Sequence, residues 1–374
     1  MSELQQSEVE ALQAIGLSAA TRQQWLADPD RSGDTLQRVV EVHRDQLRLH
    51  NGFQERNARA RLALLEDLRS SDDGLAVGDW VRVRDDASGD PWVVDRLPPQ
   101  RQLARRGNDG HGGLKRQVLV SNVDTALLVM GLDHDFNLRR LERYLALTRL
   151  AQVAVVLVLS KADTVAESNR DRRLSQARAC LPPQTPAFAL DGRSPAAATV
   201  LAPWLTRGQT AVLLGSSGAG KSTLTNVLTG ADHQAAGLGD RMQVTAAVRA
   251  DDSRGRHTTT VRTLRITPAG ACIIDTPGLR ALRLDVGDAS ELAAVFGDVA
   301  EHAVRCRFRD CRHQQEPDCA VRGSVPDQRL RSFHKLQREA QRDSMTALQR
   351  REQLSEWKAR GRAGNDRVKA KHQG

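Results

Sequence analysis

The chain has 374 residues, 40% of them hydrophobic, 27% charged and 3% aromatic, with five cysteines and a formal net charge of +9. This length predicts two or three domains, and the composition excludes a disordered protein, a disulfide-framed secreted protein and a nucleic-acid binder that relies mainly on aromatic stacking. Because the sequence contains no run of about 18 apolar residues and no secretory signal, we expect a cytoplasmic protein without a membrane span.

The N-terminal segment has the pattern of one or two short helices. Leu12 and Ile15 share a helical face, Gly16 provides a stop, and Ser18 is a suitable N-cap for a second helix. We interpret residues 1–35 as a helical extension.

Residues 36–117 change to short strands separated by turns. Valine and leucine alternate with polar residues, and Asn51-Gly52 is one of the turn signals between these segments. Several short strands in this length fit a five-stranded OB-type β-barrel, which we expect to bind RNA. The end of this region, residues 101–117, is rich in glycine and arginine. We expect it to be a mobile connector and a further RNA contact.

Strand and helix patterns alternate over residues 118–295, and a helical pattern covers residues 138–150. Alternating strands and helices build a parallel sheet that binds its ligands at the carboxyl ends of the strands. The expected fold class is therefore a multidomain α/β protein. The strand-like segments lie near residues 123–130, 153–160, 211–214 and 271–275.

A glycine loop directly follows the strand-like residues 211–214. It satisfies G-x-x-x-x-G-K-[ST] and leads into a helical pattern, the setting that this phosphate-binding motif requires. Lys221 is expected to act in catalysis by contacting the β- and γ-phosphates, and Ser222 is expected to bind Mg²⁺. A chance glycine turn is the alternative, which the strand–loop–helix setting disfavours. The expected nucleotide-binding residues here are Gly215, Ser216, Ser217, Gly218, Ala219, Gly220, Lys221, Ser222 and Thr223.

A D-x-x-G motif ends the next apolar strand. Asp275 at that strand end can hold Mg²⁺ through water, and the N–H of Gly278 can sense the γ-phosphate. Between the two motifs, the threonines at 258–260 offer a third magnesium ligand, for which we take Thr259. The alternative is that these threonines only begin a strand.

A base-reading motif precedes the glycine loop in the chain. Ser160-Lys161-Ala162-Asp163 follows an apolar strand and resembles the guanine-reading N-K-x-D, with serine in the first position. The Asp163 carboxylate can accept hydrogen bonds from guanine N1–H and N2–H₂, and the Lys161 stem can cover the ring. A polar turn at a strand end is the alternative. A matching Ser-Ala element should follow the next strand, where Ala189-Leu190-Asp191 is a degenerate candidate.

The order of the motifs indicates a circularly permuted GTPase. Ordinary GTPases place the base-reading motif after the glycine loop, but a parallel sheet tolerates the reverse order because each strand still points at the same crevice. Residue 279 is leucine where Ras-like enzymes carry a water-orienting glutamine, so intrinsic turnover should be slow. His257 is a candidate catalytic residue in place of that glutamine. The alternative is that it is a surface histidine without a catalytic role.

A cysteine and histidine cluster lies in residues 296–374, which we interpret as a zinc domain with a basic helical tail. Three thiolates and one imidazole close a tetrahedral structural zinc site, whereas an iron–sulfur cluster usually requires four thiolates. A disulfide is disfavoured in a reducing compartment. The expected ligands are Cys306, Cys311, His313 and Cys319.

The tail carries most of the excess positive charge. Residues 329–374 hold thirteen lysines and arginines against five acidic residues. Such a tail suits a polyanionic partner, because each cation that meets a phosphate releases a counterion. A solvated tail that only aids solubility is the alternative.

Taken together, these motifs resemble the RsgA (YjeQ) family of small-ribosomal-subunit-dependent GTPases. The resemblance rests on residues 135–144 (DFNLRRLERY), the order of S-K-A-D before G-S-S-G-A-G-K-S, the G-R-H-T-T-T and D-T-P-G segments, and the cysteine and histidine spacing. It implies an OB barrel at 36–117, a permuted GTPase domain at 118–295 and a C-terminal zinc domain. It also implies that His257 is the catalytic histidine of the switch loop.

The resemblance further implies a GTPase that binds the small ribosomal subunit and its rRNA late in assembly and hydrolyses GTP to GDP when rRNA stimulates it. One structural Zn²⁺ and Mg²⁺ with GTP are the expected cofactors, and we expect a monomer. The alternative is a nucleotide-switched RNA-binding assembly factor in which hydrolysis is only a release timer. A P-loop ATPase is disfavoured by Asp163.

Overall fold

The computed structural model describes residues 6–31, 33–44, 46–108, 114–230, 262–276 and 296–344. Its contacts divide the chain into two compact units. The first unit comprises residues 1–105 and 116–282, and the second comprises residues 106–115 and 283–374. Among the described residues, none of the helices combines the length and the apolar character needed to cross a membrane.

The N-terminal extension is helical, as the sequence predicts. Helices α1 (Gln6–Ala14) and α2 (Ala19–Ala27) are followed by a 3-10 turn, η1 (Pro29–Arg31). The Ser18 side chain caps α2 by accepting a hydrogen bond from the backbone N of Thr21 at 3.1 Å.

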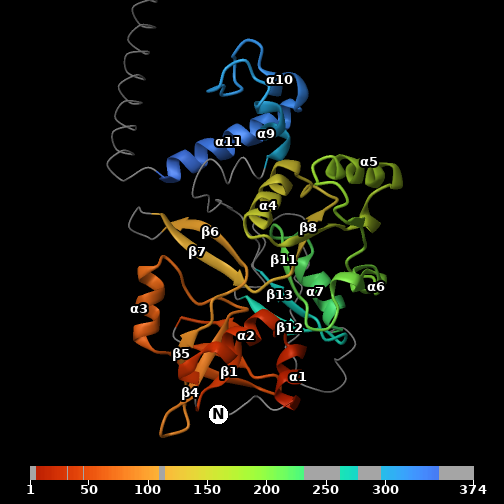
Figure 1. The fold of residues 1–374 in the computed structure, drawn as a ribbon. Coiled ribbons are helices and arrows are strands. Elements are labelled where there is room, and N and C mark those ends of the chain that lie inside the picture. The colour runs from red at the N-terminus through yellow and green to blue at the C-terminus, as the bar shows by residue number, and fades with distance from the viewer. Residues whose placement is uncertain are drawn as a thin grey trace, which may run out of the picture. The chain divides into compact units, whose positions relative to one another are not determined.

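Five strands then close into a barrel, because β1 pairs with both β2 and β4 (Figure 1). The core inside the barrel includes Val39, Leu49, Val81 and Val93, none more than 1% exposed. The predicted barrel is therefore confirmed, with a helix between its third and fourth strands that the sequence reading missed. The elements are β1 (Thr35–Val42), β2 (Leu47–His50), β3 (Glu55–Ala60), α3 (Leu62–Ser70), β4 (Trp80–Asp85) and β5 (Pro91–Arg96).

The expectation of a mobile connector at residues 101–117 is wrong for the described part of that segment. Strands β6 (Gln102–Asn108) and β7 (Leu114–Ser121) pair as a two-stranded sheet. Leu103 is fully buried, while the arginines bind across the pair: Arg105 Nε donates to Gln117 Oε1 at 3.0 Å. The basic composition thus belongs to a paired hairpin.

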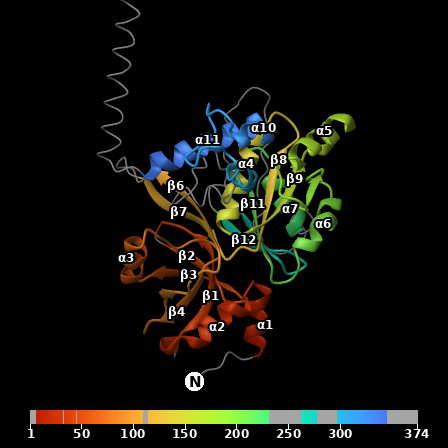
Figure 2. The ribbon, with the colours of Figure 1, turned by 45° about the horizontal axis from the view of Figure 1, so that its top comes forward.

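The remaining strands of the first unit form a mostly parallel sheet in the order β10-β9-β8-β11-β13-β12, in which only β12 is antiparallel to its neighbour β13 (Figures 1 and 2). The strands are β8 (Thr125–Gly131), β9 (Ala154–Ser160), β10 (Ala187–Ala189), β11 (Thr210–Leu214), β12 (Thr263–Ile266) and β13 (Cys272–Asp275). The helical elements are α4 (Leu138–Leu150), η2 (Ala162–Thr164), α5 (Glu167–Arg178), α6 (Ala196–Leu201), η3 (Ala202–Trp204) and α7 (Lys221–Thr229).

Barrel and sheet are continuous, because β12 also pairs with β1. The Arg38 guanidinium of β1 is fully buried at this junction. It donates to the carbonyl of Ile15 after α1, to that of Asn122 at 3.1 Å and to Thr210 Oγ1 at 3.0 Å. Burial lowers the pKa of Arg38 and makes an unpaired guanidinium costly, so these acceptors fix the extension, the barrel and the sheet together.

The second unit is helical in its described C-terminal part, as predicted. It contains α9 (Gly297–Ala303), α10 (Ala320–Ser324) and α11 (Asp327–Ser344). The rings of Phe296 and Phe333 pack edge to face with centroids 5.3 Å apart, and Arg329 of α11 pairs with Asp298 of α9. These contacts hold the helices around the cysteine and histidine cluster.

Candidate nucleotide site and metal centre

The carboxyl ends of four parallel strands gather the chemistry-bearing residues at one edge of the sheet. Strands β8, β9, β11 and β13 all run in the same direction, and each of the three predicted nucleotide-binding motifs lies at the end of one of the last three. In such sheets, this edge is where ligands bind.

The glycine loop joins β11 to α7, which begins at Lys221. Lys221 is 6% exposed, and its Nζ donates to the carbonyl oxygens of Gly215 at 3.1 Å and Ser216 at 2.8 Å. Burial lowers the pKa of Lys221, while the charges of Asp275 and Asp135 oppose that shift. The ammonium group is therefore folded back onto its own loop at the start of a helix, where anions are stabilised.

The magnesium candidates Ser222 and Asp275 are brought together. Ser222 Oγ donates to Asp275 Oδ2 at 3.2 Å, and Asp275 is fully buried at the end of β13. A hydroxyl and a carboxylate are ligands that suit Mg²⁺. The other candidates of this group, Thr259, His257 and Gly278, lie outside the described residues.

The base-reading motif contacts the glycine loop directly. Ser160 Oγ donates to the carbonyl oxygen of Ala219 at 2.6 Å. A Cβ on Gly220, whose φ is +90°, would lie 3.4 Å from the same Oγ. The two segments, which follow each other in the reverse of the usual chain order, therefore contact one another. The Ser160 side chain therefore has a structural role, because its hydrogen bond links the base motif to the glycine loop.

Asp163 has a basic partner and Lys161 has an acidic partner, and the sequence predicted neither of them. Arg193 donates to Asp163 Oδ2 at 2.6 Å, and Lys161 Nζ donates to Asp133 Oδ2 at 2.8 Å. The turn after β10 also reaches this motif, because the backbone N of Ala162 donates to the carbonyl of Leu190 at 3.1 Å. The degenerate Ala189-Leu190-Asp191 element is thus beside the base motif, as its place in the sheet requires.

A further missed residue is Asp135, in the loop after β8. Its Oδ1 accepts a hydrogen bond from the Ser216 hydroxyl of the glycine loop. The segment that carries the family resemblance begins at Asp135, but nothing in its spacing indicates a contact with residue 216. Only the order of the strands in the sheet brings the two together.

The cysteine and histidine cluster has the geometry of a metal centre. The ligand atoms of Cys306, Cys311, His313 and Cys319 all lie within 4.8 Å of one another. The Cys306 and Cys319 sulfurs are 3.9 Å apart, and His313 Nδ1 lies 3.6 Å and 3.5 Å from them. A tetrahedral Zn²⁺ with Zn–S bonds of about 2.3 Å and Zn–N bonds of about 2.0 Å sets ligand atoms roughly 3.5–3.8 Å apart, so these residues fit one zinc ion.

Burial lowers the pKa of His313, and the nearby His334 acts in the same direction. The ring is therefore neutral near pH 7 and can offer the lone pair of Nδ1 to a metal. His334 Nε2 also lies 3.1 Å from the carbonyl oxygen of His313, which ties the ligand loop to α11. Such surrounding contacts orient metal ligands.

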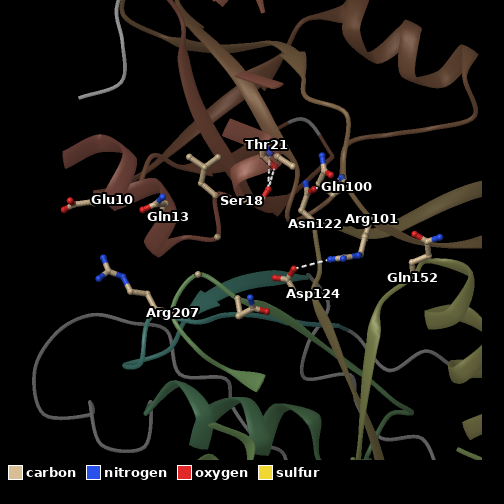
Figure 3. A pocket seen from close by; sticks show the side chains of 15 residues that line it. Glu10, Gln13, Ser18, Thr21, Gln100, Arg101, Asn122, Asp124, Gln152 and Arg207 are labelled. Atoms are coloured by element: carbon tan, nitrogen blue, oxygen red, sulfur yellow. Dashed lines mark hydrogen bonds and ion pairs between the residues drawn. The ribbon is translucent and has the colours of Figure 1, made fainter. Parts of the chain in front are cut away.

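A cleft of about 940 Å³ lies at the opposite edge of the sheet (Figure 3). Glu10 and Gln13 of α1 border it on one side and Arg207 on the other, and Arg101 pairs with Asp124 at 3.3 Å within it. Asp124 and Arg207 precede β8 and β11, so the cleft is at the amino ends of these strands. It is separate from the motif-bearing edge.

Comparisons with known proteins agree with this geometry. A family model described as RsgA GTPase matches residues 97–285. The small ribosomal subunit biogenesis GTPase RsgA 2 of Lactiplantibacillus plantarum is 36% identical over 346 residues, covering 91% of this chain and 93% of that protein. The small ribosomal subunit biogenesis GTPase RsgA of Opitutus terrae is 44% identical over 278 residues, covering 71% and 72%.

Two solved structures share the fold. YjeQ from Thermotoga maritima matches with a TM-score of 0.57 at 22% identity, over 82% of this chain and 98% of that one. YloQ, described as a circularly permuted GTPase, matches with a TM-score of 0.55 at 18% identity, over 85% and 99%. The predicted permuted arrangement is thereby confirmed as a fold.

Proposed function

The chain belongs to the RsgA GTPase family and is a GTP-hydrolysing enzyme, and we propose that it binds the small ribosomal subunit and acts in its late maturation, with hydrolysis stimulated by rRNA. The observation that carries the nucleotide assignment is the 2.6 Å hydrogen bond between Ser160 and Ala219. This contact between Ser160–Asp163 and the glycine loop supports the proposal that the two segments bind one nucleotide. The printed names of the relatives support the ribosomal assignment.

In this proposal the glycine loop and α7 hold the phosphates. Lys221 exchanges its two carbonyl acceptors for the β- and γ-phosphate oxygens and stabilises the charge that develops as the γ-phosphoryl group leaves. Ser222 and Asp275, with Thr259, would hold Mg²⁺, which would neutralise phosphate charge. Gly278 senses the γ-phosphate. Because position 279 carries no glutamine, His257 helps to orient the attacking water.

Guanine selection is assigned to the base motif. The Asp163 carboxylate accepts from guanine N1–H and N2–H₂, a pattern that adenine does not offer, and the Lys161 stem covers the ring. Ser160 and Ala162 complete the motif. Because Arg193 holds Asp163 Oδ2 in this structure, the incoming base must displace that guanidinium.

The partner is assigned from charge and from the family. The basic tail at residues 329–374 and the basic residues of the β6–β7 hairpin suit RNA phosphates. In this proposal the whole barrel domain at 36–117, which includes the hairpin, and the zinc domain at 296–374 contact RNA. The permuted GTPase domain at 118–295 would then respond to the maturation state of the bound subunit. A monomer in the cytoplasm fits this role.

The proposed activity predicts a strong response to ribosomal subunits. GTP hydrolysis by the purified full chain should rise at least about tenfold when immature small subunits are added, because the protein lacks a glutamine to order water by itself. Large subunits are the control. Tight, nucleotide-dependent binding with no stimulation would instead favour the alternative, a switched RNA-binding factor in which hydrolysis only times release.

A structural zinc ion is the second prediction of this proposal. Metal analysis of the purified protein should find one zinc per chain, and Cys306→Ser should lose it together with helical circular dichroism and thermal stability. Binding of zinc and folding of such small domains are coupled, so the loss should be cooperative. Cys180→Ser, which changes a cysteine outside the cluster, is the matched control and should keep the metal. Full helicity in a zinc-free Cys306→Ser protein would contradict the assignment.

A further inference from the structure

The loop of residues 132–137 lies between the two halves of the nucleotide site. Strand β8 pairs with β9 on one side and with β11 on the other. The loop that leaves the carboxyl end of β8 therefore stands between the base motif, which follows β9, and the glycine loop, which follows β11. Neither motif includes it.

Two acidic side chains of this loop bind the two motifs. Asp133 Oδ2 accepts from Lys161 Nζ at 2.8 Å. Asp135 is 8% exposed, and its Oδ1 accepts from the Ser216 hydroxyl while its Oδ2 accepts from the backbone N of Gly131 at 3.0 Å. One carboxylate thus contacts the base motif and the other contacts the phosphate loop.

The loop is itself fixed by the helices on either side. Arg140 of α4 pairs with Asp135. Arg173 of α5 donates to the carbonyl oxygens of Leu132 at 2.5 Å and of Asp133 at 3.1 Å. Burial works against ionisation of Asp133, but the hydrogen bonds from Lys161 and from the backbone N of Asp135, with the positive charge of Lys161, together outweigh it, and the pKa of Asp133 is lowered. The Asp133 carboxylate is therefore charged near neutral pH, and contacts with both helices anchor the loop.

We propose that Asp133 and Asp135 are positioning residues that set the placement of the base-reading and phosphate-binding halves of the site, an inference that rests on the proposed function. Asp133 holds the Lys161 stem where it must cover the purine. Asp135 holds Ser216, whose carbonyl oxygen in turn accepts from the catalytic ammonium of Lys221 at 2.8 Å. Each carboxylate acts through a motif residue.

Asp133→Asn tests the base side. The amide keeps the size of the side chain but removes the charge opposite Lys161. We expect KM for GTP to rise about tenfold while kcat changes less than about twofold, because covering the base stabilises ground state and transition state equally. Asp133→Glu should restore most of the affinity, since a longer carboxylate still reaches the Lys161 ammonium.

Asp135→Asn tests the phosphate side. Here kcat should fall about tenfold with KM within about threefold of wild type, because Lys221 stabilises charge that develops only as the phosphoryl group transfers. Ser216→Ala removes the other partner of the same hydrogen bond. The double variant should be little worse than Asp135→Asn alone, which is the signature of two residues that act as a unit.

Asp171→Asn is the matched control, because Asp171 pairs with Arg170 at 3.3 Å on the exposed side of α5 and should leave both constants unchanged. Melting temperatures are measured for every variant. If the Asp133 and Asp135 variants behave like this control, or if both lower kcat and raise KM together in proportion to lost stability, the positioning role is wrong. If wild type fails to hydrolyse GTP, or Asp163→Asn leaves base preference unchanged, the proposed function fails instead.

Discussion

Replacing Lys221 by alanine is expected to lower kcat/KM for GTP by about 10³-fold. Loss of a single preorganised donor to a developing oxyanion reduces kcat by about 10²–10³-fold, and Lys221 carries a full charge in a buried setting as well. The ammonium lies at the glycine loop, where two carbonyl oxygens accept its hydrogen bonds. The substitution therefore removes the charged group that would exchange these carbonyl oxygens for phosphate oxygens when the nucleotide binds.

The measurement is steady-state GTP hydrolysis by the full chain, with and without small ribosomal subunits. Lys335→Ala, which removes an exposed lysine of α11, is the control for intrinsic turnover. Circular dichroism must show that Lys221→Ala keeps its fold, since the substitution also leaves a cavity. Activity within tenfold of wild type in a folded Lys221→Ala protein would overturn the assignment of Lys221.

Replacing Asp163 by asparagine is expected to change the preferred base from guanine to xanthine. GDP affinity should fall at least about 10²-fold, because two charge-assisted hydrogen bonds to guanine N1–H and N2–H₂ are lost or weakened. Xanthine carries an oxygen where guanine carries its 2-amino group, and the amide of asparagine can donate to it. Xanthosine diphosphate should then bind the variant more tightly than GDP.

The chain offers a close control for this experiment. Asp191 lies 3.4 Å from the same Arg193 that binds Asp163, but we assign it no contact with the base. Asp191→Asn should therefore keep guanine preference, although it disturbs the same guanidinium. A shift to xanthine in both variants would mean that Arg193, and not Asp163, sets the base preference.

Local patterns with a single physical cause could be predicted from the sequence. Helix α4 spans Leu138–Leu150, as its periodicity indicates, because Leu141, Tyr144 and Leu147 face the core and Asn137 caps the first turn. The glycine loop, its flanking strand and helix, and the cysteine cluster were also predictable. Each depends on residues that are neighbours in the chain.

Contacts between distant segments were not predictable in the same way. Asp133, Asp135 and Arg193 carry no motif, and they reach the site only because β10, β9, β8 and β11 are neighbours in that order in the sheet. The β6–β7 hairpin was misread because its arginines suggest a solvated loop. Their hydrogen-bond partners on the opposite strand become apparent only once the two strands are paired.

The affinities of the wild-type chain for GDP and ADP, measured by calorimetry under the same conditions, test most directly whether a base-reading carboxylate and a phosphate loop share one crevice. Binding of GDP at least about 10²-fold tighter than ADP is the expected result, because only guanine offers two donors to Asp163. Equal affinities for the two nucleotides would contradict it, since phosphate binding alone would then account for recognition.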